Sequence, residues 1–345
     1  MNDTSHSNEL THSSYTVGWV CALPKELIAA SAMLDEPHPD LPRQPNDYNA
    51  YTLGRIGPHN VVMACLPKGE IGNNNSATVA TRMTSTFPSI KFGLMVGIGG
   101  GVPKTVRLGD VVVSTPSEGF GGVVQWDFGK MEQGGTFKRT GALNRPPAEL
   151  LAALTNLEKV HAMKGSTIPQ YLEELKQKYP LLASKYTRSE ALKDILFKAK
   201  YAHVVKGQAE NDKGHETEEE EDEEEEELDC VYCDISQIVR RKPRAMRVHY
   251  GLIASGNQVI KDAAFRDEIN KRLGGKVLCF EMEAAGLMND FPCIVIRGIC
   301  DYADSHKNYT WQEHAAAVAA AFAKELLSVV PAQEVEQMPV IKSKW

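Results

Sequence analysis

The sequence predicts an α/β protein with a mostly parallel sheet covered by helices on both faces. Short apolar segments alternate with segments of helical character between residues 15 and 330. The apolar segments are hydrophobic throughout, and this is typical of strands buried on both faces of a parallel sheet. Because strands that alternate with helices favour parallel pairing, we predict a single-domain, three-layer α/β/α architecture with a central, mostly parallel mixed sheet.

The N-terminal part supplies the first elements. The run YTVGWVC at 15–21 is rich in β-formers and predicts a strand, and Pro24 opens a helical pattern directly after it. Further buried strands are predicted at 60–66, 91–98 and 110–114, with a helix at 72–85. Residues 1–14 are polar and predict a disordered tail.

The middle of the chain, 115–247, departs from this alternation. It holds a Gly-rich stretch followed by three segments of helical pattern, at 147–160, 171–179 and 189–200. Ten consecutive acidic residues at 218–227 repel one another, so we predict a disordered acidic loop over 204–228. A basic run follows at 240–247. We therefore treat 115–247 as a helical insertion in the sheet-forming domain.

The alternation returns in the C-terminal part. Strands are predicted at 248–255, 276–280 and 293–300, and helices at 261–273, 281–290 and 311–330. Residues 331–345 have no clear pattern and predict a tail or a linker.

Composition narrows the function class. The formal charge of the 345 residues is −7, but without the ten acids it would be about +3, so a site for anionic substrates stays open. There is no secretory signal, no apolar run that could span a membrane, and no basic face interleaved with aromatics for nucleic acid.

Seven cysteines without a signal favour reduced thiols and a cytoplasmic protein. Cys230 and Cys233 lack a second pair of ligands, so we expect neither a metal site nor a cofactor.

Two strand ends carry acids where ligands of α/β proteins bind. Glu281, Met282 and Glu283 follow one strand, and two carboxylates around a methionine suit a sugar diol and its apolar face. Asp301 follows the next strand, where burial would raise its pKa and make it a proton donor. The alternatives are carboxylates that stabilise a helix N-terminus and an Asp that caps a helix.

Two further features belong to the same pattern. Gly97, Ile98 and Gly99 begin a glycine-rich segment whose backbone N–H groups could face a ligand or an anion. This segment matches neither the P-loop nor the dinucleotide fingerprint. Glu26 lies in the first turn of the first helix, where it either acts on a ligand or stabilises the helix dipole.

Taken together, these features resemble the nucleoside phosphorylase/nucleosidase superfamily. The matching stretches are VGWVCALPKEL, LMVGIGGGV, RLGDVVVS, GLIASGNQVI, CFEMEAAGL and VIRGICDYAD, in the family's order. The phrases GGVVQWDFGK, VHYGLIASGNQVIKD and RGICDYADSHKN are similar to the nucleosidase-like domain of fungal NLR-like defence proteins. Some relatives of that branch are ATP nucleosidases.

The resemblance implies roles for single residues. Glu283 and Met282 would bind the ribose, with Glu281 beside them. Asp301 would protonate N7 of the purine, and Glu26 would orient the attacking water. Cys300 stands where the family usually has Ser, and Val259 where small nucleosidases stack an aromatic on the base. The remaining residues expected around the base are Ser255, Asn257, Ile260 and Phe280.

Water is favoured over phosphate as the nucleophile. Phosphorylases place an Arg and a Ser at the positions held here by Met95 and Ile98, and an apolar pair cannot compensate the desolvation of phosphate. We expect a purine N-ribosidase that acts on an adenine nucleotide, with ATP as the favoured substrate and Lys307, Arg247 and Arg139 as candidate phosphate ligands. The alternatives are an adenosine or methylthioadenosine nucleosidase, a purine nucleoside phosphorylase, and a non-catalytic sensing or oligomerising module. The family also implies a homo-oligomer.

Overall fold

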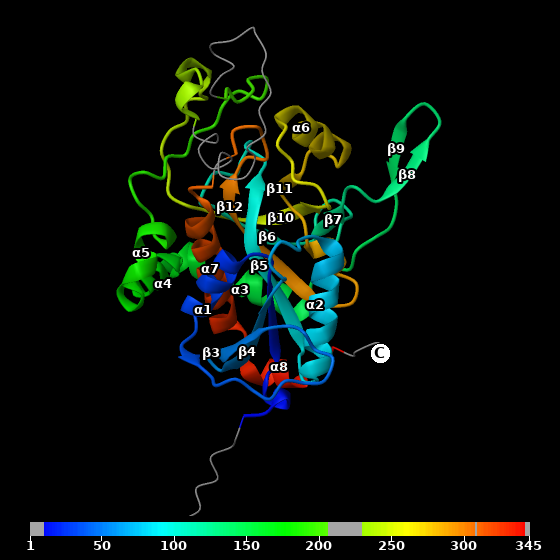
Figure 1. Cartoon of the computed structure of the whole chain (residues 1–345), viewed down its shortest axis with the longest axis vertical. Coiled ribbons are helices and arrows are strands. Elements are labelled where there is room, and N and C mark those ends of the chain that lie inside the picture. The colour runs from blue at the N-terminus through cyan, green and yellow to red at the C-terminus, as the bar shows by residue number, and fades with distance from the viewer. Residues whose placement is uncertain (1–9, 206–229, 308, 342–345) are drawn as a thin grey trace, which may run out of the picture.

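The structure is a computed structural model that describes residues 10–205, 230–307 and 309–341 (Figure 1). Most of the predicted N-terminal tail and nearly all of the predicted acidic loop lie outside these ranges. Within the described residues, no helix combines the length and the apolar character that a membrane span requires.

The strands and helices follow the predicted alternation. The strands are β1 (Val17–Cys21), β2 (Glu36–Pro37), β3 (Tyr51–Ile56), β4 (His59–Cys65), β5 (Phe92–Gly101), β6 (Val111–Ser114), β7 (Val123–Gln125), β8 (Gly129–Glu132), β9 (Thr136–Arg139), β10 (Val248–Ser255), β11 (Val277–Glu281) and β12 (Cys293–Asp301). The helices are α1 (Pro24–Ala32), α2 (Asn73–Thr86), α3 (Ala148–Lys164), α4 (Ile168–Lys178), α5 (Pro180–Tyr186), α6 (Ala263–Arg272), α7 (Gln312–Val329) and α8 (Ala332–Gln337).

The central sheet is mixed, as predicted, and has the order β11-β10-β6-β12-β5-β1-β4-β3-β2. β1 runs parallel to β4 and β5, β12 parallel to β5, and β10 parallel to β6 and β11. An additional antiparallel pairing joins β11 to the end of β5, so β11, β10, β6, β12 and β5 close into a ring. Closure draws the ends of β5, β11 and β12 together, and the sequence gives no signal for it.

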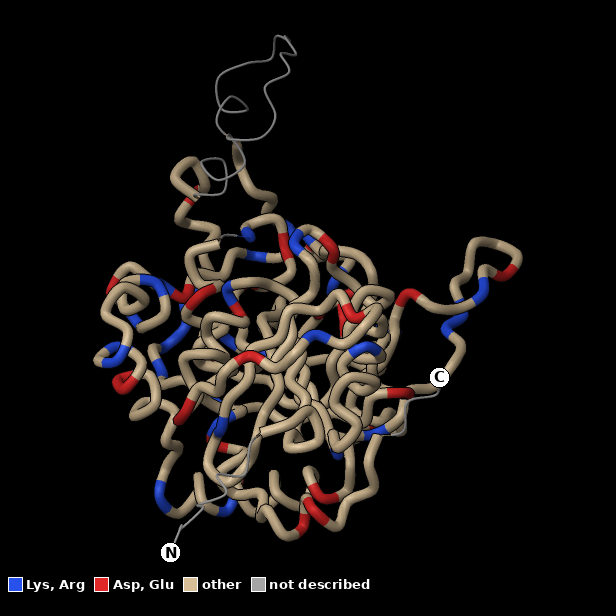
Figure 2. The backbone as a smooth tube through the Cα atoms, turned by 60° about the horizontal axis from the view of Figure 1, so that its bottom comes forward, with Lys and Arg blue, Asp and Glu red and all other residues tan. Residues whose placement is uncertain are grey.

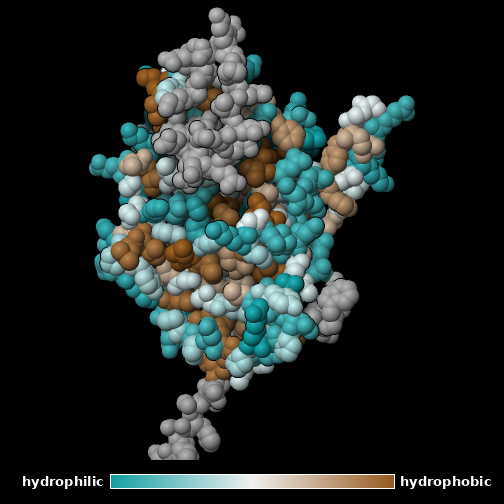
Figure 3. All heavy atoms as spheres, viewed as in Figure 1, coloured by the Kyte–Doolittle hydropathy of each residue, from teal (hydrophilic) through white to brown (hydrophobic). Residues whose placement is uncertain are grey.

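Helices cover both faces of the sheet (Figure 1). α1, α3, α4 and α7 pack with one hydrophobic core, and α7 is rich in alanines, which let it approach β12 closely. α2 packs with the second core on the other face. Apolar side chains also gather on the outer surface over α1 and α5, where Ile28 is 42% and Leu181 95% exposed (Figure 3).

Three predicted elements differ from the structure. The expected helix at 281–290 is a short 3-10 turn, Ala284–Gly286, because Glu281 is the last residue of β11 and its carboxylate accepts the N–H groups of Glu283 and Ala284. The expected helix at 189–200 is absent because its backbone bonds to 237–239 instead.

The C-terminal segment is also better ordered than the predicted tail or linker. It contains α8, and the N–H of Ile341 donates to the carbonyl of Ile90. Apolar residues of this segment, Val335 and Met338, are buried against the first core.

Candidate active site

One cavity of about 400 Å³ lies at the carboxyl ends of β1, β5, β11 and β12. It brings together most of the residues that the sequence singles out. Those that line it are Glu26, Ile98, Gly99, Val259, Ile260, Phe280, Glu281, Met282, Glu283, Asp301 and Lys307. Segments as far apart in the sequence as the first helix and the end of β12 therefore meet at a single site, because the pairing of β11 with β5 brings these strand ends together.

A buried guanidinium organises the acidic side of this cavity. Arg297, on β12, is 1% exposed and is bound by the carboxylate of Glu281 and, at 3.2 Å, by that of Glu283. Its Nη1 also donates to the carbonyl of Ile98 at 3.3 Å. Buried carboxylates can stay ionised when a buried cation pairs with them in this way. Arg297 thus fixes both acids of the strand end.

Glu281 has a positioning role in this arrangement. Its Oε2 accepts the N–H groups of Glu283 and Ala284 at 3.1 and 2.9 Å, in addition to the guanidinium of Arg297. Among the described residues, Glu283 accepts one backbone N–H, from Gly72 at 3.3 Å. Oε1 of Glu281 has no hydrogen-bond partner among these residues, so both acids keep acceptor capacity for ligand hydroxyls.

Burial changes the protonation of Glu283. Its pKa is raised to about 7, chiefly by desolvation; Arg297 opposes this shift, and the nearby Glu281 and Glu26 add to it. The guanidinium faces three carboxylates, so it cannot compensate all of them when they are ionised. Near neutral pH this part of the site can gain or lose a proton as a ligand binds.

Glu26 is held by three backbone donors. Its Oε2 accepts the N–H groups of Ala22 and Leu23 at 2.7 and 3.0 Å, and its Oε1 accepts that of Ile98 at 2.7 Å. Burial raises its pKa, and Arg297 and these donors oppose that shift. A fixed, buried carboxylate of raised pKa is suited to accept a proton from water.

The glycine segment serves Glu26, not an anion. Gly97, Ile98 and Gly99 lie within β5, which continues beyond the predicted strand end at 98, and the N–H of Ile98 donates to Glu26. A Cβ on Gly97 would lie 2.3 Å from Oε1 of Glu26 and 2.6 Å from Nη1 of Arg297. Glycine is therefore required at 97 so that the carboxylate and the guanidinium can approach the strand.

Asp301 has a different electrostatic environment from the predicted one. Burial disfavours its charge, but Lys307 at 3.0 Å and the N–H of Ala303 at 2.8 Å outweigh burial and lower its pKa. The expected raised pKa is therefore wrong, because the sequence does not show that Lys307 folds back onto Asp301. The Sγ of Cys300 also donates to Asp301, at 3.3 Å.

The residues expected around the base divide into two groups. Phe280 and Ile260 are buried and line the cavity, and Val259 lines it with 48% of its surface exposed. Ser255 and Asn257 do not line it. Ser255 Oγ accepts the N–H of Ala285 at 3.0 Å, and Asn257 Oδ1 accepts that of Asn73 at 3.1 Å, so both hold neighbouring loops together.

Only one of the three candidate phosphate ligands reaches the cavity. Lys307 lines it. Arg247 is exposed, and its backbone N–H donates to Asp110 at 2.9 Å, away from the cavity lining. Arg139 belongs to the hairpin β8–β9, which projects from the body with charges of both signs (Figure 2), and its guanidinium lies over the ring of Phe120. The cation that sequence reasoning missed is Lys261, which is exposed and lines the cavity.

Arg297 is the other residue that sequence reasoning missed. A signal for it exists, because an arginine stands inside the otherwise apolar run CIVIRGIC. A charge within a buried strand needs partners, and the carboxylates of the neighbouring strand end are the obvious ones.

Comparisons with known proteins agree with this description. No family model matches the chain. An NLR-like protein of Hyaloscypha variabilis is 44% identical over 339 residues, which cover 96% of this chain. The chain spans 31% of the length of that relative. A 5'-methylthioadenosine/S-adenosylhomocysteine nucleosidase of Mycobacterium bovis is 22% identical, with 92% of this chain and 97% of the relative covered.

Solved structures show the same fold. The methylthioadenosine/S-adenosylhomocysteine nucleosidase of Streptococcus pneumoniae superposes with a TM-score of 0.55 at 16% identity, covering 92% of this chain and all of the other. The futalosine hydrolase of Helicobacter pylori gives 0.54 at 16% identity, covering 92% and 99%. These superpositions show that the chain has the same fold as this nucleosidase and this hydrolase.

Proposed function

We propose that this protein hydrolyses the N-glycosidic bond of an adenine nucleoside or nucleotide. The observation that carries the proposal is that one cavity is lined by Glu26, Glu283 and Asp301 together, each from a different segment of the chain. A carboxylate for water, a carboxylate for the sugar and an acid for the base are the groups that such a reaction needs.

The sugar binds to the strand end of β11 in this proposal. Glu283 accepts hydrogen bonds from the ribose hydroxyls, and the half-buried Met282 lies against the apolar face of the sugar. Arg297 and Glu281 act as positioning residues, because they hold Glu283 in place. Positive charge develops on the ribose as the bond to the base breaks, and the nearby carboxylates stabilise it.

Glu26 and Asp301 act on the two ends of the breaking bond. Glu26 takes a proton from the water that attacks C1′ of the ribose, and Asp301 donates a proton to N7 so that the base leaves as neutral purine. Asp301 forms an ion pair with Lys307 at 3.0 Å. It therefore gains its proton only when the arrival of the purine separates it from Lys307.

Hydrolysis is favoured over phosphorolysis because the hydrogen-bond donors that could bind a phosphate ion beside C1′ are already bound to carboxylates. Arg297 is occupied by Glu281 and Glu283, and the N–H of Ile98 by Glu26. Met95 is fully buried in the second core, away from the cavity. A phosphate beside C1′ would meet carboxylates and apolar side chains, so its desolvation would stay uncompensated.

For the substrate we favour an adenine nucleotide, with ATP first. Lys261 and Lys307 give the cavity two lysines that can interact with phosphates. The fungal relative is named as an NLR-like protein, and this supports a defence role for the release of adenine from ATP. A 5′-thioalkyl nucleoside is the second candidate, because Leu23, Ile71 and Val259 also line the cavity and could cover an apolar 5′ group.

The two candidates are separated by one set of assays. The purified chain is incubated with ATP, ADP, AMP, adenosine and methylthioadenosine, and free adenine is measured by mass spectrometry. Faster release from ATP, reduced by Lys261→Met, supports the nucleotide. Faster release from methylthioadenosine supports the thioalkyl nucleoside. No adenine from any of the five contradicts the proposed function and favours a sensing module.

Glu132→Gln is the matched control for substitutions of the site carboxylates. Glu132 is exposed on the β8–β9 hairpin, so its loss of charge should leave adenine release unchanged.

Oligomerisation also remains a proposal, and the apolar surface over α1 and α5 is the face we favour for it (Figure 3). Leu181→Lys should then shift the sedimentation of the protein towards the monomer.

A further inference from the structure

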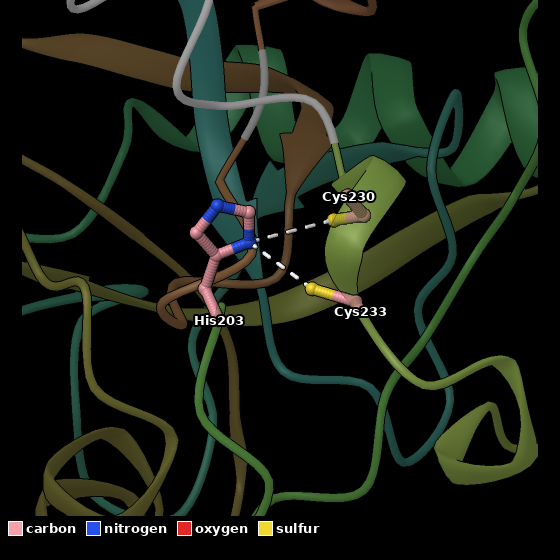
Figure 4. A group of neighbouring side chains, drawn as sticks. All are labelled: His203, Cys230 and Cys233. Atoms are coloured by element: carbon pink, nitrogen blue, oxygen red, sulfur yellow. Dashed lines mark hydrogen bonds between the residues drawn. The ribbon is translucent and has the colours of Figure 1, made fainter. Parts of the chain in front are cut away.

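A cluster of three metal-ligating side chains lies in the insertion, outside the active site. His203, Cys230 and Cys233 bring their ligand atoms within 4.8 Å of one another (Figure 4). Sequence reasoning found the two cysteines and no further ligand. The structure adds a third candidate ligand, because the fold brings His203 to Cys230 from 27 residues upstream.

The distances within the cluster fit tetrahedral coordination. Cys230 Sγ lies 3.7 Å and Cys233 Sγ 3.4 Å from Nδ1 of His203. A tetrahedral Zn²⁺ with Zn–S bonds of about 2.3 Å and Zn–N bonds of about 2.0–2.1 Å would separate sulfur and nitrogen by about 3.6 Å. The three ligand atoms therefore already lie near three corners of a zinc tetrahedron.

The surroundings also suit bound thiolates. Cys233 is buried, and the N–H of Val204 points at its Sγ at 3.5 Å, as a donor that would stabilise a thiolate. The hydroxyl of Tyr201 accepts the N–H of Asp234 at 2.6 Å, so the two segments are joined on both sides of the cluster. A cavity of about 340 Å³ borders Cys230 and leaves room for a water molecule as fourth ligand.

We propose that His203, Cys230 and Cys233 bind one Zn²⁺ ion with a structural role. Two thiolates and an imidazole are the ligands that zinc prefers in proteins. The ion would join residue 203 to residues 230–233. Such a link lowers the conformational entropy of the unfolded chain and so stabilises the folded protein. This proposal does not depend on the proposed reaction.

The zinc site would also support the loop that carries Asp301 and Lys307. The backbone N–H of His203 donates to Oγ of Ser305 at 3.1 Å, and the ring of His203 lies edge-on to that of His306 at 5.6 Å. His306 in turn stacks on Phe197 at 4.1 Å. Loss of the ion should therefore loosen this loop as well as the insertion.

The first test is the metal content of the full chain. Protein without a polyhistidine tag is produced in zinc-supplemented medium, gel-filtered, and analysed by inductively coupled plasma mass spectrometry. We expect about one zinc per chain, lost at least fivefold in Cys230→Ser, Cys233→Ser and His203→Gln. Cys65→Ser is the matched control, because Cys65 is also half-buried but lies on β4, and it should keep its zinc.

A second measurement covers variants that fail to fold. The wild-type chain is stripped with a chelator under reducing conditions and titrated with Co²⁺. We expect a thiolate-to-cobalt absorption band and the intense visible bands of tetrahedral cobalt, saturating at about one equivalent, with a thermal midpoint that rises on saturation. Absence of zinc together with absence of these bands would overturn the proposal. So would zinc content unchanged by the cysteine variants, or a Cys230–Cys233 disulfide in protein that binds no metal.

Discussion

Replacing Arg297 with methionine should destabilise the protein, and the loss should increase with pH. Arg297 is 1% exposed, and its partners Glu281 and Glu283 are almost as deeply buried. Removing one partner from a buried ion pair costs about 3–5 kcal/mol, because the remaining charge is left uncompensated. Methionine fills much of the volume of arginine, so a cavity adds little to this cost.

The pH dependence follows from the direction of the pKa shift. In the folded protein the pKa of Glu283 is raised to about 7, above its ordinary value, although Arg297 lowers it. A raised carboxyl pKa means that the folded state holds more protons, so its stability falls as pH rises through the folded pKa. Without Arg297 the pKa rises further. The additional loss in the variant therefore begins near the wild-type pKa of about 7 and grows with pH until the higher pKa of the variant is passed, so the cost should be smaller near pH 5 than near pH 8.

Urea unfolding of both proteins near pH 5 and near pH 8 measures the effect. Arg266→Met is the comparison variant, because Arg266 is 2% exposed but faces the largely exposed Asp267 at 2.8 Å and a single buried carboxylate, that of Asp304, at 3.9 Å. Its loss of stability should depend less on pH. A cost for Arg297→Met below about 1 kcal/mol near pH 8, or a cost that is the same at both pH values, would refute the reasoning, since buried pairs cost more and carboxylates must titrate.

The other predictions concern the reaction. Asp301→Asn should lower adenine release by about 10²–10⁴-fold while the far-ultraviolet circular dichroism stays unchanged, and retained activity would exclude Asp301 as the acid. Lys307→Met removes the ammonium that lowers the pKa of Asp301, so the alkaline limb of the pH profile of kcat/KM should move to higher pH; an unmoved limb would contradict this pairing. Gly97→Ala should displace Glu26, with a cost of about 1–3 kcal/mol in stability and loss of turnover, and a fully active variant would show that Glu26 does not act there.

The alternation of strands and helices could be predicted because local patterns encode it. The apolar runs around Val96 and Ile253 require burial on both faces, and Pro24 marks a helix start. The closure of the sheet through the pairing of Gly100 with Phe280 could not be predicted, because it depends on contacts between distant segments. The missed α8 is held by tertiary bonds such as that between Ile341 and Ile90.

The site shows the same division. Glu26, Glu283 and Asp301 could be selected because acids at strand ends carry a local signal and the resemblance assigns their roles. The charge states could not be predicted, because the lowered pKa of Asp301 depends on the position of Lys307. Arg139 and Arg247, the other two candidate phosphate ligands, do not line the cavity. Their positions could not be predicted either, because they lie in the insertion, where the pattern of the sheet does not indicate which side chains reach the site.

The central claim is that water breaks an N-glycosidic bond in this cavity. Turnover of the best substrate of the panel in water enriched in heavy oxygen, in phosphate-free buffer, tests it directly. We expect free adenine together with a ribose product that carries one heavy oxygen at C1′, and far slower release of both products from Asp301→Asn. Release of adenine only when phosphate is added, with phosphate instead of heavy oxygen at C1′, would contradict it.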